Sequence, residues 1–578
     1  MATTPPIDTQ SVNARAKGSA TATRRPSATV GGRQLEHQSV VSAPERLVVV
    51  GMGMAAHGLC KRLNQIDGLK HYQVTVIGKE PTIAYDRVNL SQLFTGRVPE
   101  DLLLADQAWY DERKIDVVTS RTIPQIDCDE QTLNDDHGQQ YGYDKLVIAT
   151  GSSAFVPPID GIDSQGVFVY RTLNDLAEIR RYVEERRDKQ NPLSTMRGGV
   201  IGGGLLGLEA AQVLQHLGLE VDIFEMAPGL MPRQLDARGA DRLRDWVEET
   251  GANVHLVRRT KKIERTDDDQ LTLSFHNASA LEVDILIVAT GVRPNDQLAK
   301  ANGLATGSRG GFAVNSNLET SAPNVFAVGE CVSFHNHLYG LAAPCFRMAD
   351  VLAERLAGRD EQFHGADESA ELKLLGVNVI TIGKTLGDSP GVIPLIHFDA
   401  SGYRKLLLEK GRVVGASCVG EWSQLHQVRH AIEHQTILWP WQRLRFQKTG
   451  VPWAIAENLP VHQWPRSSTI CSCLGIKKQV IEQTIDHCGG AESQRLEQVI
   501  ERCRASTACG SCRPLVAELV GAPASKSASP GSKTILIASL IALLLGVGVS
   551  LLPPLGFSLS VTDQWRNIDW LWRNDTAR

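Results

Sequence analysis

The sequence predicts an α/β protein of several domains, with two Rossmann-like units in series. Two segments about 150 residues apart share one order of elements: a buried strand, a glycine-rich turn, a helix, and a second strand that ends at an acid. Each segment is followed by a strand that ends in Ala-Thr-Gly. This order is typical of parallel, doubly wound sheets. Later segments predict a small α+β domain, a small helical domain with clustered cysteines, and one C-terminal transmembrane helix.

The length and composition exclude several classes of protein. The chain has 578 residues, of which 42% are hydrophobic and 22% are charged, so one small module, wholesale disorder and a polytopic membrane protein are all excluded. Lys and Arg number 60 against 65 Asp and Glu, which gives a net charge of -5. No overall basic field therefore favours a nucleic acid partner.

The N-terminal segment, residues 1–44, is rich in Ser, Thr, Ala, Arg and Pro. It has few large apolar side chains to offset the entropy of ordering, so we expect a disordered tail. A transit peptide has a similar composition, but this segment has no amphipathic apolar stripe. No secretory signal with an apolar core opens the chain, which favours a reducing cytosol.

The first repeated unit begins with the strand Leu47 to Val50, and its turn contains Gly51 and Gly53, with Ala56 in place of a third glycine. In such a turn the first glycine permits the tight bend, and the second lets the backbone approach a pyrophosphate at the helix N-terminus. The next strand ends before Glu80, whose carboxylate can accept hydrogen bonds from ribose hydroxyls. Turns that bind no ligand are the alternative for both units.

The second unit repeats the pattern with Gly202, Gly204 and Gly207, and its second strand ends at Glu225. An acid at this position would repel a 2′-phosphate, and no basic residue follows until Arg233. The sequence therefore favours NADH over NADPH.

Six of the eleven cysteines lie between residues 471 and 512. Two tight pairs, Cys471 with Cys473 and Cys509 with Cys512, supply four thiolates that suit tetrahedral zinc or a [2Fe–2S] cluster equally by count. A neighbouring flavin would favour the cluster. A disulfide framework would require an exported chain. The two cysteines between the pairs are interpreted as structural, although either could still contribute to the cluster: Cys488 and Cys503.

The C-terminal region contains an uncharged run from Thr534 to Leu552. As a helix it would be roughly 28 Å long, which matches a hydrocarbon core of about 30 Å. We therefore expect one transmembrane helix, preceded by a linker at 522–532, with a buried core helix as the alternative. Basic residues lie on both sides of the run, so the orientation of the tail stays open.

Several motifs together resemble the FAD-dependent pyridine nucleotide-disulphide oxidoreductase superfamily: both glycine turns, both Ala-Thr-Gly strands, Gly291-Val292-Arg293-Pro294-Asn295, and Asn324 to Glu330. The resemblance implies two Rossmann-like domains of the three-layer ββα type, with FAD at the first turn and NAD(P)H at the second. The implied contacts with FAD are Gly51, Gly53, Ala56, Glu80, Arg87, Thr150, Gly151, Gly329 and Glu330. The implied contacts with NAD(P)H are Gly202, Gly204, Gly207, Glu225 and Gly291.

Some of these residues have plainer alternatives. Glu330 stands where the family usually has Asp against the FAD ribitol, and without the resemblance it reads as a solvated loop acid. Arg87 would lie beside the flavin or form a surface ion pair. Glu209 either approaches the nicotinamide or only favours the helix N-terminus, so no catalytic residue is certain. The chain has no cysteine between Cys60 and Cys128, and Ser91 stands near the place where single-cysteine relatives carry theirs.

The cysteine segment resembles the bacterioferritin-associated ferredoxin-like (BFD-like) [2Fe–2S] domain, which implies Cys471, Cys473, Cys509 and Cys512 as ligands. The order of domains is similar to the N-terminal half of the NAD(P)H-dependent nitrite reductase large subunit, whose sirohaem-binding half has no counterpart here. The expected bounds are 46–162 with 285–345 for the FAD domain, 163–284 for the NAD(P)H domain, 365–455 for the small α+β domain and 468–520 for the cluster domain.

The sequence thus predicts an oxidoreductase that passes electrons from NADH through FAD to a [2Fe–2S] cluster and on to an unknown acceptor. Its catalytic domains would be cytoplasmic, because NADH is there, and one C-terminal helix would hold them at a membrane. The alternatives are an electron-input subunit of an assimilatory nitrite or nitrate reductase system and a membrane-tethered redox sensor. A homodimer is left open.

Overall fold

The structure is a computed structural model that describes residues 43–189, 195–386, 390–453, 460–471, 474–507, 510 and 512–521. Most of the predicted N-terminal tail, the linker at 522–532 and the run at 534–552 lie outside the described residues. Among the residues that are described, no helix is both long enough and apolar enough to span a bilayer.

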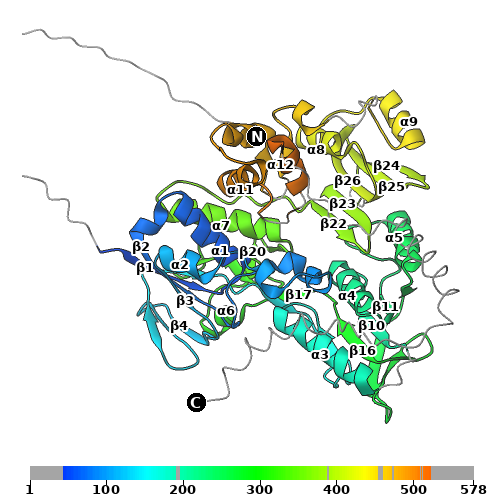
Figure 1. Cartoon of the computed structure of the whole chain (residues 1–578), viewed down its shortest axis with the longest axis horizontal. Helices are drawn as coiled ribbons and strands as arrows, with labels where there is room; N and C mark the ends of the chain where they lie inside the picture. The colour runs from blue at the N-terminus through cyan, green and yellow to red at the C-terminus, as the bar shows by residue number, and fades with distance from the viewer. Residues whose placement is uncertain are drawn as a thin grey trace, which may run out of the picture. The chain divides into compact units, whose positions relative to one another are not determined.

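The first dinucleotide-type domain is built on a parallel sheet in the order β19-β7-β1-β2-β3. Figure 1 labels three of these strands, β1, β2 and β3. The strands β1 and β7 are buried almost throughout because both faces of the sheet are covered. The sheet strands are β1 (Glu45–Val50), β2 (Tyr72–Ile77), β3 (Ile115–Val118), β7 (Lys145–Ile148) and β19 (Val325–Ala327). The helices are α1 (Met54–Gln65), α2 (Gln107–Glu112), α6 (Gln297–Ala301) and α7 (Ala342–Leu356), with the 3-10 helices η1 (Gly68–His71), η2 (Arg87–Phe94) and η3 (Pro99–Leu102).

Two smaller sheets flank this domain. One is antiparallel, with β4 (Gln125–Asp127), β5 (Thr132–Asn134) and β6 (Gln140–Gly142). The other is mixed, with β18 (Phe312–Val314), β20 (Val332–Phe334) and β21 (His337–Leu338).

The second dinucleotide-type domain has a parallel sheet in the order β12-β11-β10-β16-β9. Its sheet strands are β9 (Val167–Val169), β10 (Arg197–Ile201), β11 (Glu220–Phe224), β12 (Asn253–His255) and β16 (Ile285–Val288). Its other elements are α3 (Leu173–Lys189), α4 (Leu205–His216), α5 (Ala237–Glu249) and the antiparallel strands β13 (Thr260–Arg265), β14 (Leu271–Phe275) and β15 (Leu281–Val283). Two paired strands, β8 (Ser152–Ala154) and β17 (Val292–Pro294), carry the chain between the two domains.

A five-stranded antiparallel sheet forms the small α+β domain, in the order β22-β23-β26-β25-β24. Its elements are β22 (Ala370–Leu374), β23 (Val377–Gly383), β24 (Val392–Asp399), β25 (Gly402–Glu409), β26 (Arg412–Gly420), α8 (Leu425–Glu433) and α9 (Pro440–Thr449). Asp236, at the N-terminus of α5, accepts hydrogen bonds from Tyr403 (2.6 Å) and from Lys405 (2.9 Å) of β25. Lys405 is only 1% exposed and Asp236 is 31% exposed, and this partly buried pair joins the small domain to the second dinucleotide-type domain.

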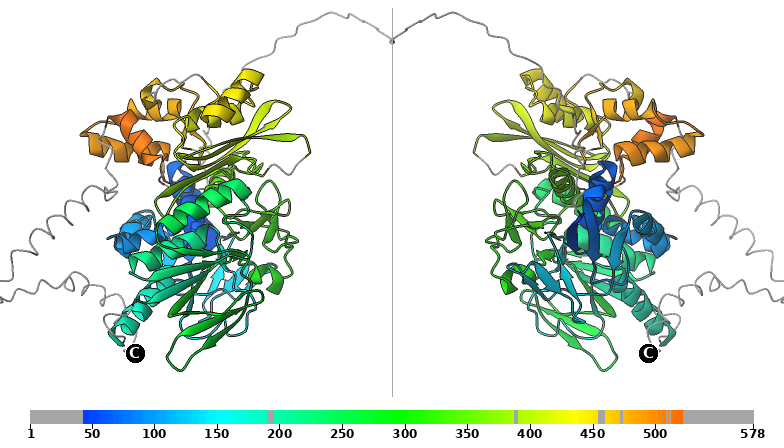
Figure 2. Two further views of the ribbon diagram at one scale, coloured as in Figure 1. Left: turned by 90° about the vertical axis from the view of Figure 1, so that its right-hand side faces the viewer. Right: turned by 90° about the vertical axis from the view of Figure 1, so that its left-hand side faces the viewer.

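The last described domain contains the cysteines and is mainly helical, as its orange helices show in Figure 2. It consists of η4 (Val461–Gln463), the hairpin β27 (Thr469–Cys471) with β28 (Ile476–Lys477), α10 (Lys478–Ile485), α11 (Glu492–Cys503) and α12 (Arg513–Val520). Lys478 is buried and donates to the carbonyl oxygens of His462 (2.5 Å) and Trp464 (2.8 Å).

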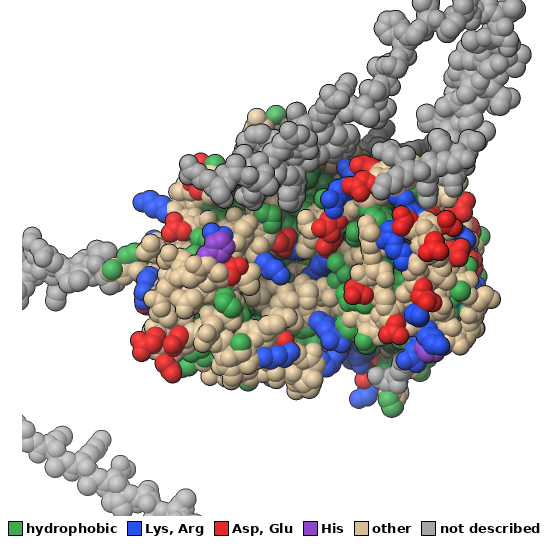
Figure 3. Space-filling view, turned by 90° about the horizontal axis from the view of Figure 1, so that it is seen from below, with side chains coloured by type: hydrophobic (Ala, Val, Ile, Leu, Met, Phe, Trp, Pro, Cys, Tyr) green, Lys and Arg blue, Asp and Glu red, His purple; other side chains and the backbone are tan. Residues whose placement is uncertain are grey.

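On the face of the molecule shown in Figure 3, Lys and Arg side chains are interspersed with Asp and Glu.

Candidate functional site

The first glycine turn connects β1 to α1 and is shaped for a close approach of the backbone. Gly51 has a φ of +116°, and a Cβ atom there would lie 2.1 Å from the carbonyl oxygen of Ala149. Gly53 is the N-cap of α1, with open space where its Cβ would be. No side chain caps this helix end, and its first turn has no acid. The backbone N–H groups of α1 are therefore available to an anionic group such as a pyrophosphate.

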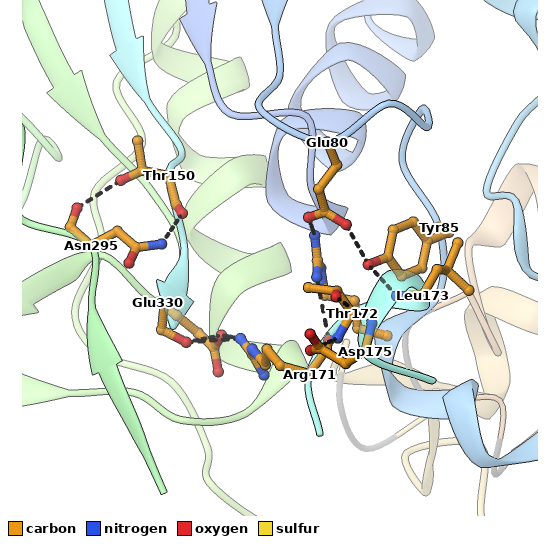
Figure 4. A network of polar contacts seen from close by, with 11 residues as sticks. Glu80, Tyr85, Thr150, Arg171, Thr172, Leu173, Asp175, Asn295 and Glu330 are labelled. Atoms are coloured by element: carbon orange, nitrogen blue, oxygen red, sulfur yellow. Dashed lines mark hydrogen bonds and ion pairs between the residues drawn. The ribbon is translucent and has the colours of Figure 1, made fainter. Parts of the chain in front are cut away.

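Glu80 and Arg87, predicted to contact different parts of FAD, form an ion pair with each other. Glu80 is labelled in Figure 4. The other oxygen of Glu80 accepts a hydrogen bond from the hydroxyl of Tyr85 at 2.7 Å. The Arg87 guanidinium also donates to the carbonyl oxygen of Arg171 at 3.4 Å. One ion pair spans only a few Å, whereas the ribose of the adenosine and the flavin ring lie at opposite ends of FAD. The structure brings the two residues together, and their separate contacts with FAD stay predictions.

Arg171 is a residue that the sequence reasoning missed. Its guanidinium forms an ion pair with Glu330 and donates to Ser152 Oγ at 2.8 Å, and Ser152 Oγ donates to Glu330 at 2.9 Å (Figure 4). Both charged side chains are less than one-fifth exposed. Glu330 is therefore a paired acid at the end of the first sheet, not a solvated loop acid. The preceding Gly329 has a φ of +90°, a conformation that favours glycine.

The Ala-Thr-Gly motifs fasten the two connections between the dinucleotide-type domains. Thr150 Oγ1 donates to the carbonyl oxygen of Asn295 at 2.9 Å, and Asn295 Nδ2 donates back to the carbonyl oxygen of Thr150 at 2.8 Å. The backbone N–H of Asn295 also donates to the carbonyl oxygen of Gly151 at 2.9 Å. In the second motif, Thr290 Oγ1 donates to the carbonyl oxygen of Phe155 at 2.7 Å. Gly291, which follows, has a φ of +117° and open space at its Cβ position.

The second glycine turn, between β10 and α4, is tighter than the first. Gly202 has a φ of +115°, and a Cβ atom on Gly207 would lie 1.8 Å from the carbonyl oxygen of Gly202. No residue other than glycine fits at position 207 without a shift of the helix. Gly204 is the N-cap of α4, with open space at its Cβ position, no capping side chain and no acid in the first helical turn. This helix end is therefore also available to an anionic group.

Glu225 lies directly against the second glycine turn. Its carboxylate accepts hydrogen bonds from the backbone N–H groups of Gly203 and Ala227, each at 2.6 Å. A carboxylate has about four lone-pair sites, so it retains acceptor capacity for ribose hydroxyls. The backbone N–H of Arg258 donates to the carbonyl oxygen of Glu225 at 2.8 Å. The fold thus brings beside this acid a basic residue that its sequence neighbours did not reveal.

Glu209, on α4, is grouped with Tyr170 and Ser91. Burial raises the pKa of the Glu209 carboxyl to about 8. Burial, and then the charge of Glu209, raise the pKa of Tyr170, whose side chain is 3% exposed. Ser91 lies in η2, which packs on α4. Its side chain is close enough to Tyr170 to lower the pKa of that hydroxyl, against the larger effect of burial. The position predicted to replace the redox cysteine of relatives is therefore close to the only carboxyl on the described part of α4.

Two of the four predicted cluster ligands are described, and both lie in the core of the helical domain. Cys471 ends β27 and is 0% exposed, and Cys512, at the N-cap of α12, is 6% exposed. The N-terminus of a helix stabilises a thiolate, which favours ligation by Cys512. The other two predicted ligands, Cys473 and Cys509, lie outside the described residues.

Cys488 and Cys503 pack in the same core as the two described ligands. Burial, and then nearby Cys471 and Cys488, raise the pKa of the Cys503 thiol. A raised pKa suits a neutral structural thiol better than a metal ligand. Within the described ranges, no three His, Cys, Asp or Glu residues are arranged to hold a metal ion. The described cysteines therefore do not form a ligand set without Cys473 and Cys509.

The residues present fit the cofactors implied by the resemblance. Each of the two uncapped helix ends follows a turn in which at least one glycine has no room for a Cβ atom, namely Gly51 in the first turn and Gly207 in the second. Dinucleotide binding requires such turns. The cysteines are soft ligands in an apolar core, as an iron–sulfur cluster requires.

Comparison with known families agrees with this reading. Residues 45–349 match Pyridine nucleotide-disulphide oxidoreductase, which covers more than half of the chain. Residues 369–436 match the Rubredoxin NAD+ reductase C-terminal domain. Residues 469–522 match the BFD-like [2Fe-2S] binding domain.

Individual relatives extend the similarity over most of the chain. The nitrite reductase (NADH) large subunit of Escherichia coli K12 is 37% identical over 494 residues, which cover 83% of this chain and 56% of that protein. The assimilatory nitrate reductase electron transfer subunit of Bacillus subtilis 168 is 32% identical over 481 residues, covering 82% of this chain and 59% of that protein. This chain therefore spans somewhat more than half the length of either relative.

A solved structure shares the fold. The NAD-dependent persulfide reductase from A. fulgidus aligns with a TM-score of 0.60 and 25% identity, over 68% of this chain and 77% of that one.

Proposed function

Because this chain belongs to the pyridine nucleotide-disulphide oxidoreductase family and has a BFD-like [2Fe–2S] binding domain, we propose that it takes electrons from NADH and delivers them to a separate acceptor. The predicted enzyme class, an FAD-dependent NAD(P)H oxidoreductase, is confirmed by the family match, and so are the predicted FAD, nicotinamide nucleotide and [2Fe–2S] cluster. The observation that supports the electron route is the presence of two open helix ends and a cysteine core in one chain.

Each cofactor would be held by a separate part of the chain. The N-terminus of α1 would bind the pyrophosphate of FAD, and the Arg171–Glu330 pair would position the groups next to it. The N-terminus of α4 and Glu225 would bind NADH. Cys471, Cys473, Cys509 and Cys512 would hold the cluster. When bound, FAD accepts two electrons as a hydride and the cluster accepts one electron at a time, so the protein contributes placement and electrostatics.

An anaerobic absorption spectrum of the purified protein tests this route. We expect flavin bands and a cluster spectrum, both of which bleach when NADH is added. In Cys509→Ser the flavin should still bleach, but the cluster signal and the reduction of an acceptor through the cluster should be lost. Bound zinc without iron, or a folded protein without flavin, would contradict the proposal.

A narrower function is favoured by two relatives whose names concern nitrite and nitrate reduction. We propose that this chain supplies electrons to a separate nitrite or nitrate reductase partner, because it covers only 56% and 59% of those proteins. Mixing the reduced chain with candidate partner subunits and measuring NADH-dependent loss of nitrite or nitrate tests this. Turnover with artificial acceptors but with no partner subunit would support the general electron-transfer function and contradict the narrower one. Failure of steady NADH oxidation would favour a redox sensor.

Membrane attachment through residues 534–552 is proposed from their length and lack of charge. With the catalytic domains in the cytoplasm, such an anchor would raise the effective concentration of the chain beside a membrane partner. The full chain should resist extraction from membranes at alkaline pH, and a chain that ends at residue 532 should be released. Release of both chains would contradict the anchor.

A further inference from the structure

An ion pair joins the cysteine-bearing domain to the first dinucleotide-type domain. Nη1 of Arg504 lies 2.5 Å from Oδ1 of Asp350 on α7, and the two side chains are 11% and 14% exposed. Arg504 is the C-cap of α11 and has a φ of +64°. It directly follows Cys503, and the predicted ligands Cys509 and Cys512 come five and eight residues later in the sequence.

The same end of α11 also lies against α1, the helix that follows the first glycine turn. Gln65 of α1 donates to the carbonyl oxygen of Glu501 at 3.3 Å. Burial, Lys61 and Arg504 together lower the pKa of His57 to about 3, and burial and Arg504 lower the pKa of Lys61. Arg504 is therefore close enough to act on two side chains of α1, one in each half of the helix.

The helices α1 and α7 are packed so closely that they form one support. A Cβ atom on Gly58 would lie 2.9 Å from the ring of Phe346. Arg62 of α1 forms an ion pair with Glu354 of α7. Because His57 is only one turn beyond the N-cap of α1, the support for Arg504 and the predicted pyrophosphate site belong to the same rigid pair of helices.

We propose that Arg504 is a positioning residue that fixes the C-terminal end of α11, and with it the cluster domain, against α1 and α7, so that the cluster accepts electrons from FAD at a set distance. This inference rests on the proposed function. Asp350 is largely buried, so removal of Arg504 would leave an unpaired buried carboxylate and would favour separation of the two domains. Electron transfer weakens steeply with distance, so loosening this contact would slow the step between the two cofactors without changing the flavin site.

The cluster domain has a second attachment that keeps the test interpretable. Thr469 Oγ1 donates to Glu433 of α8 at 2.7 Å, and the rings of His426 and Trp464 stack at 4.1 Å. Loss of Arg504 should therefore loosen one side of the domain without releasing it.

Rapid anaerobic mixing of the full chain with NADH tests the proposal, with flavin bleaching and cluster reduction followed separately. In Arg504→Ala we expect flavin bleaching at the original rate and cluster reduction slower by about tenfold or more. The content of iron and the spectrum of the dithionite-reduced cluster should not change. Arg504→Lys should recover part of the rate, and the exchanged pair Arg504→Asp with Asp350→Arg should recover more than either single change.

Arg502→Ala is the matched control. This arginine lies two residues away and donates to the carbonyl oxygen of His487 within its own domain at 2.7 Å. It should leave the rate of cluster reduction within about twofold of the original, since an exposed contact contributes little. Hydrogen exchange of the purified chain gives a readout that does not depend on activity: Arg504→Ala should expose α7 near Asp350 and the end of α11, and Arg502→Ala should not expose α7.

The outcomes separate this inference from the proposed function. An unmodified chain whose flavin does not bleach with NADH would overturn the proposed function. Normal bleaching with an unchanged rate of cluster reduction in Arg504→Ala would overturn only the positioning role. Equal slowing in Arg502→Ala, or no recovery in the exchanged pair, would overturn it as well.

Discussion

The two dinucleotide-type domains begin with the same turn but differ in what lies against the helix that follows. In both, the first glycine has a positive φ, and a Cβ atom would meet the carbonyl oxygen of an Ala-Thr-Gly strand, at 2.1 Å for Gly51 and 2.5 Å for Gly202. Five residues later the first domain has Ala56 and the second has Gly207. The shared turn is required by the backbone alone, whereas the later positions depend on the neighbours of each helix.

Position seven after the first glycine shows the difference most clearly. The first domain has Gly58, which allows the ring of Phe346 on α7 to approach α1. The second domain has Glu209, whose carboxyl is buried among Tyr170 and Ser91. One helix thus uses this position for packing and the other for a titratable group, which favours a structural role for Gly58 and a role near the substrate for Glu209.

Gly207→Ala should have the largest effect. The added methyl would lie 1.8 Å from the carbonyl oxygen of Gly202, so α4 would have to move away from the turn. We expect a loss of about 3 kcal/mol in the stability of the second domain and loss of bleaching by NADH, with bound FAD retained. Calorimetry and flavin absorbance measure the two effects. Normal bleaching with unchanged stability would show that the turn is less tight than the structure indicates.

Glu209→Gln should change how stability depends on pH. Burial raises the pKa of Glu209 from a usual value of 4.5 to about 8. Between these values the unfolded chain releases the proton while the folded chain retains it, so the stability of the original protein falls as the pH rises. The variant should therefore gain on the original protein between pH 5 and pH 8, by on the order of 3 kcal/mol. Calorimetry at several pH values measures this, and a gain that does not change with pH would contradict the raised pKa.

The sequence was sufficient for features that depend on local backbone chemistry. The glycine turns and the Ala-Thr-Gly strands could be predicted because each requires particular residues at fixed spacings, and the cysteine pairs because two close thiolates favour a metal centre. The partners of the acids could not be predicted. Arg171 and Glu330 are 159 residues apart in the sequence, so no local pattern predicts their pairing. The sequence next to Arg171 indicates only a helix start, at which Thr172 and Asp175 cap each other. Glu80 and Arg87 were assigned from a motif, whereas their pairing depends on how η2 folds back to β2.

Glu225→Ala should weaken NADH binding more than Glu80→Ala weakens FAD binding. Glu225 accepts from the backbone N–H of Gly203 in the glycine turn and from that of Ala227, and hydrogen bonds to a charged acceptor contribute about 1.5 to 3 kcal/mol each. We expect the NADH concentration for half-maximal bleaching to rise by about tenfold or more. The carboxylate of Glu80 is already paired with Arg87 and Tyr85, so its loss should change FAD content by less. Titrations of both variants measure this, and a reversed order would place Glu80 on the adenosine ribose after all.

Ala56→Gly should have the smallest effect on cofactor binding and is the counterpart of Gly207→Ala. Ala56 is 0% exposed and stands where the second domain has Gly207. Replacing it with glycine causes no clash, but it removes a packed methyl group and raises the backbone entropy of the unfolded chain. Glycine is about 1 kcal/mol less favourable than alanine inside a helix, and the lost methyl adds a similar amount. FAD content and bleaching by NADH should be retained, with a lower unfolding temperature of the first domain. If Ala56→Gly instead removed FAD while Gly207→Ala left NADH bleaching intact, the difference between the two turns would be the reverse of the one that the structure shows.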